Sequence, residues 1–479
     1  MKFDKNLDKN VSMLKEKLKN NGMIVFRDIR NSYAPEIRAT IIFADGIAGA
    51  TLLNDFVVKP FITSDTLKDS KDKLSFVMES VVFSNDVVKS SDYEQCINAL
   101  FSGDALFLID GYDEILLVNA RFPFTRSVSE SENEKSLKGP RDSFGELILQ
   151  NTALLMRRIK NPDFKIERFI IGENTKTTVL MCYIEGICEN EMVEKVRNRI
   201  SKIKTDSLFD TNQISELIKG KTYTPFKTSG STERPDIAAN KLLEGRIVIM
   251  TDGSPQAITV PFLFNEYFQS NDDYTINFYF ASIARLVRYI SFYISVYLPA
   301  LYICAIKFQK TILPESLLQS LSSERAGAAF SVTAEVLIFL IFFEIIREAA
   351  TRTPSAIGQT MSIVGGLILS ETAASANIVS TPSIIVIAIA GITSVILPQM
   401  TGATTLLRIC FVLLASFLGI YGLTIGTIIL AIHLCSIDIL EIAYVNSTIP
   451  LNRYSMFDTI IRAPYKYLER KKRYMRKKF

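Results

Sequence analysis

EAATRTPSAIGQTMSIVGGLILSETAASANIVS, residues 348–380, is the stretch of sequence that decides the fold of this chain. It begins with charge at Glu348 and Arg352, turns at Thr353-Pro354, and then reads as a helix candidate over Ile357–Val379. A helix of about 20 residues or more is long enough to cross the core of a bilayer. The candidate is rich in glycine, serine and threonine, and inside a membrane such polar side chains must face other helices or water. The stretch therefore predicts a membrane protein with a polar inner helix.

Two neighbouring stripes run along this helix candidate when its residues are placed at about 3.6 per turn. The first stripe has small side chains, which let another helix approach closely, at Gly358, Ser362, Gly365 and Gly366. The second stripe is apolar in the middle and acidic toward its end, and consists of Met361, Val364, Ile368, Glu371 and Ser375. If several copies surround an axis, Val364 and Ile368 form a hydrophobic gate and Glu371 forms an acidic ring that favours cations. The alternative is that these side chains only pack within one bundle, with Glu371 paired to a neighbour.

The chain of 479 residues changes character after about Ser282. Before that point charged and apolar residues alternate as in a soluble protein, whereas the sequence from Tyr289 to about Leu434 is membrane-like. The membrane-like part has five apolar segments: Ile290–Ile306, Ala328–Ile346, Ile357–Val379, Ser383–Leu397 and Ile409–Leu434. We expect Pro299 to break the first segment. The fourth segment is shorter than the roughly 20 residues that a span needs, so we expect about four spans plus one incomplete element.

Charge at the two ends of the chain predicts its orientation. The first thirty residues are highly charged and contain no apolar signal segment, so the N-terminal half should stay in the cytosol. The last fourteen residues carry a cluster of lysine and arginine, which the positive-inside rule also places in the cytosol. The number of full crossings should therefore be even.

The first half of the chain predicts two α/β lobes. Strand patterns occur at Ala105–Ile109 and Glu114–Asn119, with Asp110-Gly111 between them as a hairpin turn. A second hairpin is predicted within 246–260. The aromatic residues between Pro261 and Arg288 suit either an interfacial collar or an ordinary amphipathic packing helix.

The predicted fold class is an α/β two-lobed cytosolic N-terminal region followed by an all-α polytopic membrane domain. Its five parts are cytosolic lobe 1 (1–138), α/β cytosolic lobe 2 (139–232), a juxtamembrane hairpin and interfacial collar (233–288), the membrane domain (289–434) and a cytosolic basic tail (435–479).

Acidic residues recur along the second apolar segment. Glu344 and Arg347 are three residues apart, and Glu348 and Arg352 are four apart, which are spacings for ion pairs on one helix face. We expect these pairs to form a charged helix end at the interface. Glu335 lies deeper in the segment, where it could contact a partner or line a vestibule.

The sequence indicates no catalytic or cofactor site. The only histidine is His433, which excludes a metal site built on histidines, and the six cysteines show no CxxC pair. No histidine or convincing nucleophile–base pair occurs in the soluble half, so we predict that the chain is not an enzyme and binds no cofactor or metal. The small net charge of +4 gives no indication of nucleic-acid binding.

Several separate blocks of this sequence resemble one known family. They are the ERPD run (Glu233, Arg234, Pro235 and Asp236), KGPRDSFGELILQNTALLMRRIK (138–160), and the block from Glu348 through Arg352, Thr353, Pro354 and Gln359 to the N-I-V-S-x-P ending. In this order they are similar to the A subunit of GerA-type spore germinant receptors. The resemblance covers about 100–434, and Ser370 stands where that family usually has glycine.

The resemblance implies a subunit that works with a permease-like B subunit and a lipoprotein C subunit in the inner membrane of a bacterial endospore. It also implies that A subunits assemble, as a pentamer, into a cation channel that germinant binding opens. Its pore element on this chain would be Ile357–Val379, with the narrowest point near Val364.

Two other functions remain open from the sequence. A transporter-like subunit would place a substrate site at mid-membrane between discontinuous helices, for which Pro299, Pro382 and Pro398 are candidates. A structural signalling scaffold would use the soluble lobes to recruit partners. For the scaffold, mutations in the pore stripe should leave ion flux unchanged.

Overall fold

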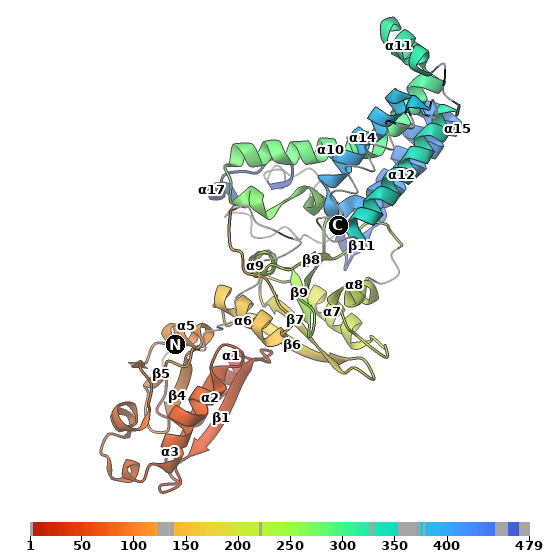
Figure 1. Cartoon of the computed structure of the whole chain (residues 1–479). Coiled ribbons are helices and arrows are strands. Elements are labelled where there is room, and N and C mark those ends of the chain that lie inside the picture. The colour runs from red at the N-terminus through yellow and green to blue at the C-terminus, as the bar shows by residue number, and fades with distance from the viewer. Residues whose placement is uncertain are drawn as a thin grey trace. The chain divides into compact units, whose positions relative to one another are not determined.

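The computed structural model describes these parts of the chain: 3–121, 134, 138–219, 223–325, 327, 329–352, 371, 374–376, 379–445 and 458–468. They form two compact units, which we call the α/β unit (Met1–Lys221 with Thr228–Phe262) and the helical unit (Thr222–Lys227 with Leu263–Lys471). Figure 1 shows both units. The predicted juxtamembrane part, 233–288, is divided between them.

The first lobe of the α/β unit contains a five-stranded antiparallel sheet in the order β1-β2-β4-β5-β3. The strands are β1 (Ile24–Arg30), β2 (Arg38–Ala44), β3 (Val87–Ser90), β4 (Ala105–Ile109) and β5 (Ile115–Val118). Leu106 lies opposite Leu117 in the β4–β5 pair, which confirms the predicted hairpin. Gly111 in its turn has a φ of 95°, a backbone conformation that favours glycine.

Strand β4 is buried on both faces. Leu106 and Leu108 contribute to one hydrophobic core, whereas Phe107 and Ile109 contribute to another, because successive side chains of a strand point to opposite faces. The helices of this lobe are α1 (Leu7–Lys17), α2 (Ala50–Leu53), η1 (Asn54–Val58), α3 (Lys59–Thr63), η2 (Thr66–Asp69), α4 (Lys73–Phe76), η3 (Val77–Val81) and α5 (Tyr93–Ser102).

The second lobe repeats the antiparallel design with the strand order β6-β7-β9-β10-β8. Its strands are β6 (Phe164–Ile171), β7 (Thr177–Ile184), β8 (Gly230–Thr232), β9 (Ile247–Thr251) and β10 (Ala257–Val260), and its helices are α6 (Ile148–Arg158), α7 (Asn190–Ser201), α8 (Thr211–Ile218) and α9 (Pro235–Leu243). The hairpin predicted within 246–260 is the β9–β10 pair. Because β9 also pairs with β7, this hairpin is part of the second sheet.

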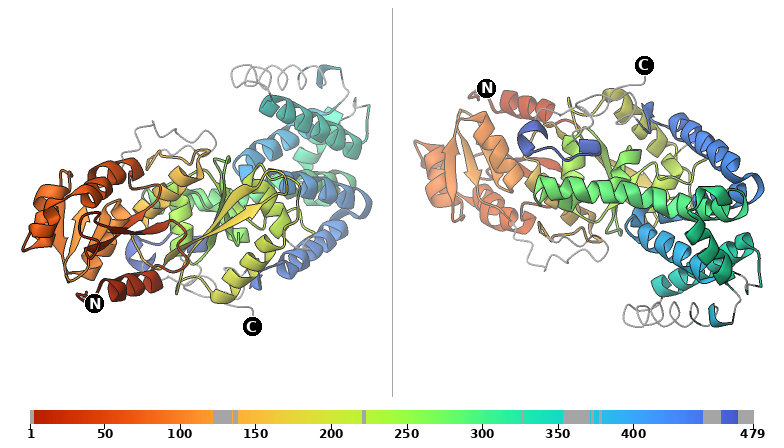
Figure 2. Two further views of the ribbon diagram at one scale, coloured as in Figure 1. Left: turned by 90° about the horizontal axis from the view of Figure 1, so that it is seen from below. Right: turned by 90° about the horizontal axis from the view of Figure 1, so that it is seen from above.

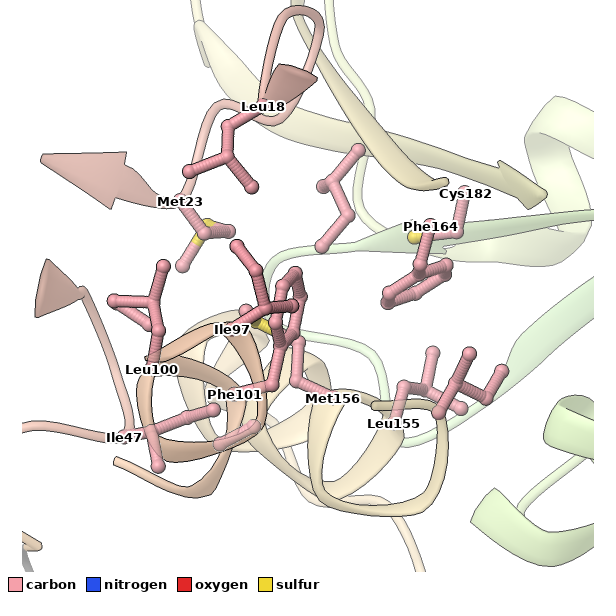
Figure 3. Close-up of a cluster of buried hydrophobic side chains, with 14 of the residues drawn as sticks. Leu18, Met23, Ile47, Ile97, Leu100, Phe101, Leu155, Met156, Phe164 and Cys182 are labelled. Atoms are coloured by element: carbon pink, nitrogen blue, oxygen red, sulfur yellow. The ribbon is translucent and has the colours of Figure 1, made fainter. Parts of the chain in front are cut away.

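The two lobes share one hydrophobic core. Figure 3 shows it between them, with side chains from α5, α6, β6 and β7 directed inward at Leu100, Phe101, Met156, Phe164 and Cys182. A backbone hydrogen bond of 2.9 Å from the Gly22 N–H to the Ile166 carbonyl joins them as well. A continuous core makes the two lobes one body.

The helical unit is built around long apolar helices. Its elements are η4 (Phe264–Phe268), η5 (Asn271–Tyr274), α10 (Phe278–Lys307), η6 (Lys310–Ile312), α11 (Glu315–Arg325), α12 (Val332–Arg352), α14 (Thr381–Val395), η7 (Pro398–Met400), α15 (Thr401–Ser436), β11 (Asp438–Ile439), β12 (Ile442–Ala443) and α17 (Tyr465–Leu468). Within the described ranges two helical stretches, Phe278–Lys307 and Pro398–Ser436, are long and apolar enough to cross a membrane, and Thr381–Val395 is a shorter apolar helix.

Pro299 does not break the first apolar segment, so that prediction was wrong. Helix α10 continues through Pro299 as one helix of 30 residues, which Figure 2 shows in green. A proline has no N–H to donate to the carbonyl four residues earlier, which here belongs to Ser295. The Ser295 carbonyl instead accepts a hydrogen bond of 2.7 Å from Arg408 Nε. A partner from another helix replaces the missing donor.

The last apolar segment, Ile409–Leu434, was counted as one span in the sequence analysis, but it is not one continuous helix. Gly419 has a non-helical φ of 56° and ψ of −138° within α15. A Cβ on Gly422 would lie 2.3 Å from the Leu414 carbonyl oxygen, although eight residues of straight helix would separate these positions by about 12 Å. The chain therefore folds back at Gly419, and α15 consists of two antiparallel halves, 401–418 and 420–436.

The aromatic residues between Pro261 and Arg288 have two structural roles. Phe268 stacks on Tyr289 with ring centroids 3.9 Å apart, and Phe264 packs edge to face against Phe292. By contrast, Tyr279 and Phe280 in the first turn of α10 are exposed. Phe264 and Phe268 therefore pack inside the helical unit, whereas Tyr279 and Phe280 are available to a membrane interface.

Candidate functional site

Most of the predicted pore stripe lies outside the described residues. This applies to Met361, Val364 and Ile368, to the packing residues Gly358, Ser362, Gly365 and Gly366, and to the motif residues Thr353, Pro354 and Gln359. Two members of the stripe, Glu371 and Ser375, are described, and both are exposed on the single chain. The structure describes the elements that precede and follow the stripe in the sequence.

Upstream of the stripe, α12 ends in two ion pairs. Glu344 pairs with Arg347, and Glu348 pairs with Arg352. These are the two pairs predicted from the sequence spacing, and both are confirmed. The Glu348–Arg352 pair is largely exposed at the helix end, as expected for an interface position.

Downstream of the stripe, a buried carboxylate holds the start of α14. Glu335 on α12 is fully buried, and its Oε2 accepts hydrogen bonds of 2.6 Å from both Ser380 Oγ and Ser383 Oγ. The Ser380 N–H also points at Oε2, at 3.4 Å. These donors lie at the N-terminal end of α14, where a helix favours negative charge. Glu335 thus anchors the residue that follows the predicted pore element.

Two further side chains extend this group, which we call the Glu335 cluster: Tyr302, Arg325, Glu335, Ser380 and Ser383. Tyr302 Oη on α10 lies 3.2 Å from Ser383 Oγ. Arg325 Nη2 on α11 lies 3.6 Å from Glu335 Oε1. Among the described residues, neither Glu335 Oε1 nor Arg325 Nε has a hydrogen-bond partner. The cluster joins four helices but leaves two polar atoms unsatisfied.

A second buried charge lies on the first half of α15. Arg408 is 1% exposed, and its Nη2 donates to Ser295 Oγ at 2.6 Å and to the Ala390 carbonyl at 3.3 Å. Its Nη1 lies 3.8 Å from Glu344 Oε1. Arg408 therefore connects α10, α12 and α14. The sequence analysis missed it, although a lone arginine just before an apolar run was a usable signal, because a charge inside such a segment needs a partner.

A third charged group was also missed. Arg285 and Asp273 are both fully buried and form an ion pair of 2.8 Å, and Arg285 also pairs with Asp458 at 2.9 Å. These contacts tie the segment around Asp458 to the beginning of α10. No local pattern links residues so far apart in the chain.

The ERPD run has a structural place in the α/β unit. Pro235 is in the first turn of α9, where its missing N–H needs no partner. Arg234 pairs with Asp236 at 2.7 Å, and the Glu233 carbonyl accepts a hydrogen bond of 2.7 Å from the Phe144 N–H. The run thus starts α9 and fastens it to the segment before α6.

The α/β unit also contains a pocket of about 760 Å³ between Asn20, β6, β7 and α7. Within it, Glu167 accepts hydrogen bonds of 2.7 Å from Arg197 Nε and from Tyr183 Oη. Burial raises the pKa of Glu167, but these hydrogen bonds outweigh the effect and leave the pKa lowered. Arg197 and Tyr183 thus satisfy Glu167 within the chain, and this contact indicates no particular class of ligand.

Comparison with known proteins identifies the family. The model of the Bacillus/Clostridium GerA spore germination protein family matches residues 12–474. The chain belongs to this family. Its GerA relatives include spore germination protein KA of Bacillus subtilis, 31% identical over 96% of this chain and 85% of that protein. GerLA of Bacillus cereus is 30% identical over 92% of this chain and 90% of that protein.

Two further matches complete the comparison. The uncharacterized membrane protein YfkQ of Bacillus subtilis is 33% identical over 97% of this chain and 91% of that protein. The crystal structure of the N-terminal domain of the A subunit of the Bacillus megaterium spore germinant receptor GerK3 is 32% identical, with a TM-score of 0.45, and covers 55% of this chain and 98% of that one. Membership of the GerA family gives this chain a role in spore germination.

Proposed function

We propose that this chain is the channel-forming A-type subunit of a nutrient germinant receptor. Several copies, with five as the expected number, would surround a cation pathway lined by Val364, Ile368 and Glu371. Germinant binding would shift the population of a dewetted gate at Val364 and Ile368 toward a hydrated one. Monovalent cations would then leave the dormant core.

One observation carries the proposal: buried polar contacts join α12 and α14, the helices that precede and follow the polar stretch 357–379 in the sequence. Glu335 anchors Ser380 at its downstream end, and Arg408 connects the neighbouring helices. Buried polar contacts of this kind hold the neighbouring helices in a defined arrangement. Glu371 and Ser375 are exposed on the single chain, which suits side chains that other copies would enclose.

We place the chain in the inner membrane of the endospore, and the fold-back at Gly419 changes the expected number of passages. Helices α10 and α12, the pore stretch and the two halves of α15 would make five passages, so the number is even only if the short helix α14 also crosses the membrane. An even number leaves both termini in the cytosol, as the charged ends predict. The receptor would also contain a permease-like B subunit, which binds the nutrient, and a lipoprotein C subunit.

The decisive experiment measures cation retention in spores that carry Val364→Ala. The smaller side chain widens and wets the gate, so these spores should lose cations without nutrient. Val395→Ala is a matched control, because Val395 is 65% exposed on α14 and lies outside the stripe. Normal dormancy and normal ion retention in Val364→Ala spores would contradict a gate at this position.

A second variant tests the acidic ring. Glu371→Gln removes the charge but keeps the shape, so gating should persist while cation selectivity weakens. Glu348→Gln is its control, since Glu348 is also an exposed carboxylate next to the stretch. Unchanged selectivity in Glu371→Gln would place Glu371 outside the pathway.

Two alternatives make different predictions. A transporter-like subunit with a mid-membrane substrate site would require flux that saturates with one solute, and the short helix α14 between Pro382 and Pro398 is the feature that favours it. A structural signalling scaffold predicts that neither Val364→Ala nor Glu371→Gln changes ion flux.

A further inference from the structure

A second pocket, of about 770 Å³, lies in the helical unit at the far end of α10 from Phe278. Its walls are the last residues of α10, the helix α11, the start of α12 and the Ser416 region of α15. Several chain reversals occur at this level: α10 ends at Lys307, α12 begins at Val332, and α15 folds back at Gly419. Phe308 lies against Gly419, where it closes this end of the bundle.

The charge of this pocket has one sign. Lys307, Lys310 and Arg325 line it, and among the described residues its lining contains no aspartate or glutamate. Lys307 Nζ donates a hydrogen bond of 2.8 Å to the neutral Ser416 carbonyl. In the part of the chain that the structure describes, neither Lys307 nor Lys310 pairs with a carboxylate. Arg325 is the only one of the three that faces a carboxylate, that of Glu335 at 3.6 Å.

Arg325 also has spare hydrogen-bonding capacity. Its Nε is buried and has no hydrogen-bond partner among the described residues, and the Arg325–Glu335 separation of 3.6 Å is longer than a charge-assisted hydrogen bond. A buried donor without a partner in the protein takes one from outside it, which is either a water molecule or a bound group. An anion in the pocket would supply it.

The remaining lining is apolar and hydroxylic. Leu318 and Leu321 come from one face of α11, and Leu337 comes from α12. Ser322 and Ser331 add hydroxyl donors. A free anion needs only the cations and hydroxyls, whereas the leucines suit an acyl chain attached to the anion.

We propose that this pocket binds the phosphate headgroup of an anionic phospholipid, with Lys307, Lys310 and Arg325 on the phosphate and the leucines against the glycerol and upper acyl chains. The position fits, because the ends of membrane-crossing helices lie at the depth of the lipid headgroups. The inference rests on membrane residence but not on ion conduction. With the N-terminus in the cytosol, the lipid comes from the opposite leaflet.

The site has a consequence for the proposed pore. The Arg325 guanidinium lines the pocket and also faces the Glu335 carboxylate. Glu335 in turn accepts a hydrogen bond from Ser380, which follows the pore stretch. A bound phosphate competes with Glu335 for Arg325. Lipid composition would thereby act on the element that anchors the pore stretch.

The test uses the purified full-length chain and measures lipid retention by native mass spectrometry after exchange into phosphatidylglycerol or phosphatidylcholine. The chain should retain phosphatidylglycerol in preference. Lys307→Gln/Lys310→Gln should reduce that preference about 30-fold, since it removes two basic groups that each contribute about 1 kcal/mol near an anionic headgroup. Arg352→Gln is the matched control, because it removes an exposed positive charge from the other end of α12. Equal retention of the two lipids by the wild-type chain would overturn the proposal, and so would equal losses in the pocket and control variants.

Two further arms separate a lipid site from the loss of a structural contact and from a free-anion site. Lys310→Gln alone leaves the Lys307–Ser416 contact intact, so a reduced preference in this variant cannot result from loss of that contact. Inorganic phosphate is tested beside phosphatidylglycerol vesicles for its effect on thermal stability. Equal stabilisation by both would identify a free-anion site and contradict a lipid site. Val364→Ala should retain phosphatidylglycerol normally, which separates this result from the test of the channel.

Discussion

Arg408 Nε donates a hydrogen bond of 2.7 Å to the carbonyl of Ser295, the carbonyl that Pro299 leaves without a donor inside α10. A proline that the sequence marks as a helix break is thus compatible with a continuous helix, because a guanidinium from α15 satisfies the exposed backbone oxygen. The same side chain connects to α12 through Glu344. The buried Arg408 side chain therefore supports the continuity of α10 and also links α10 to α12.

This relationship predicts a coupling between Arg408 and Pro299. Arg408→Met should destabilise the helical unit by on the order of 3 kcal/mol, since it removes one member of a buried polar group and leaves the Ser295 carbonyl unpaired. Pro299→Ala restores an N–H for that carbonyl. The double variant should therefore lose less stability than Arg408→Met alone. Thermal unfolding of the four proteins of this cycle in detergent measures the coupling.

Arg352→Met serves as the control for this cycle, because the exposed Arg352–Glu348 pair should contribute only about 0–1 kcal/mol. Strict additivity of Arg408→Met and Pro299→Ala would show that the Arg408–Ser295 bond does not compensate for the proline.

A second prediction concerns the Glu335 cluster. Glu335→Ala removes the acceptor of Ser380 and Ser383, whose hydrogen bonds to the charged group contribute roughly 1.5–3 kcal/mol each. The end of the pore stretch then loses its anchor, so spores with this change should show altered nutrient-triggered cation release. Glu348→Ala, at the exposed end of the same helix, should have little effect. Release at the wild-type rate in Glu335→Ala spores would mean that Ser380 needs no anchor.

The turn of α15 gives a third prediction. Gly419→Ala places a Cβ about 3.1 Å from the Phe308 ring at a φ of 56°, so both contact and backbone strain oppose it. We expect a loss of roughly 1–3 kcal/mol in stability. Gly402→Ala is the matched control, because a Cβ there meets nothing within 4 Å. That change should be neutral or stabilise the helix by up to about 1 kcal/mol. Similar unfolding temperatures for the two variants would argue against a fold-back at Gly419.

The fourth prediction is a pH dependence in the α/β unit. Hydrogen bonds from Arg197 and Tyr183 overcome the effect of burial and lower the pKa of Glu167 in the folded state. A lowered carboxyl pKa stabilises the fold above the unfolded value of about 4.3, and this stabilisation disappears as the pH falls through the folded value. The difference in unfolding temperature between the wild-type chain and Glu167→Gln should be present at neutral pH and shrink in acid.

Glu36→Gln, which changes an exposed carboxylate, provides the comparison for this titration. A difference between the wild-type chain and Glu167→Gln that stays constant from neutral pH into acid would show that Glu167 does not carry the effect.

Local patterns were sufficient for much of the fold. Alternation and the Asp110-Gly111 turn predicted the β4–β5 hairpin, and residue spacing predicted both ion pairs at the end of α12. The short length of the fourth apolar segment also appears in α14. The break at Pro299 was predicted wrongly, because the continuity of α10 depends on a distant partner, Arg408. The last segment was counted as one span, because the approach of Leu414 to Gly422 is visible only in the folded chain.

The sequence by itself determined the division into an α/β half and an apolar helical half, since hydrophobic periodicity and chain charge are local quantities. Blocks of sequence in a fixed order were also enough to indicate the family. Only the tertiary structure decided where the buried charges meet. Glu335 with Ser380, Arg408 with Ser295, and Arg285 with Asp458 are separated by 45 to 173 residues, and no periodicity links them. A buried charge needs a partner, and the packing of the helices decides which residue becomes that partner.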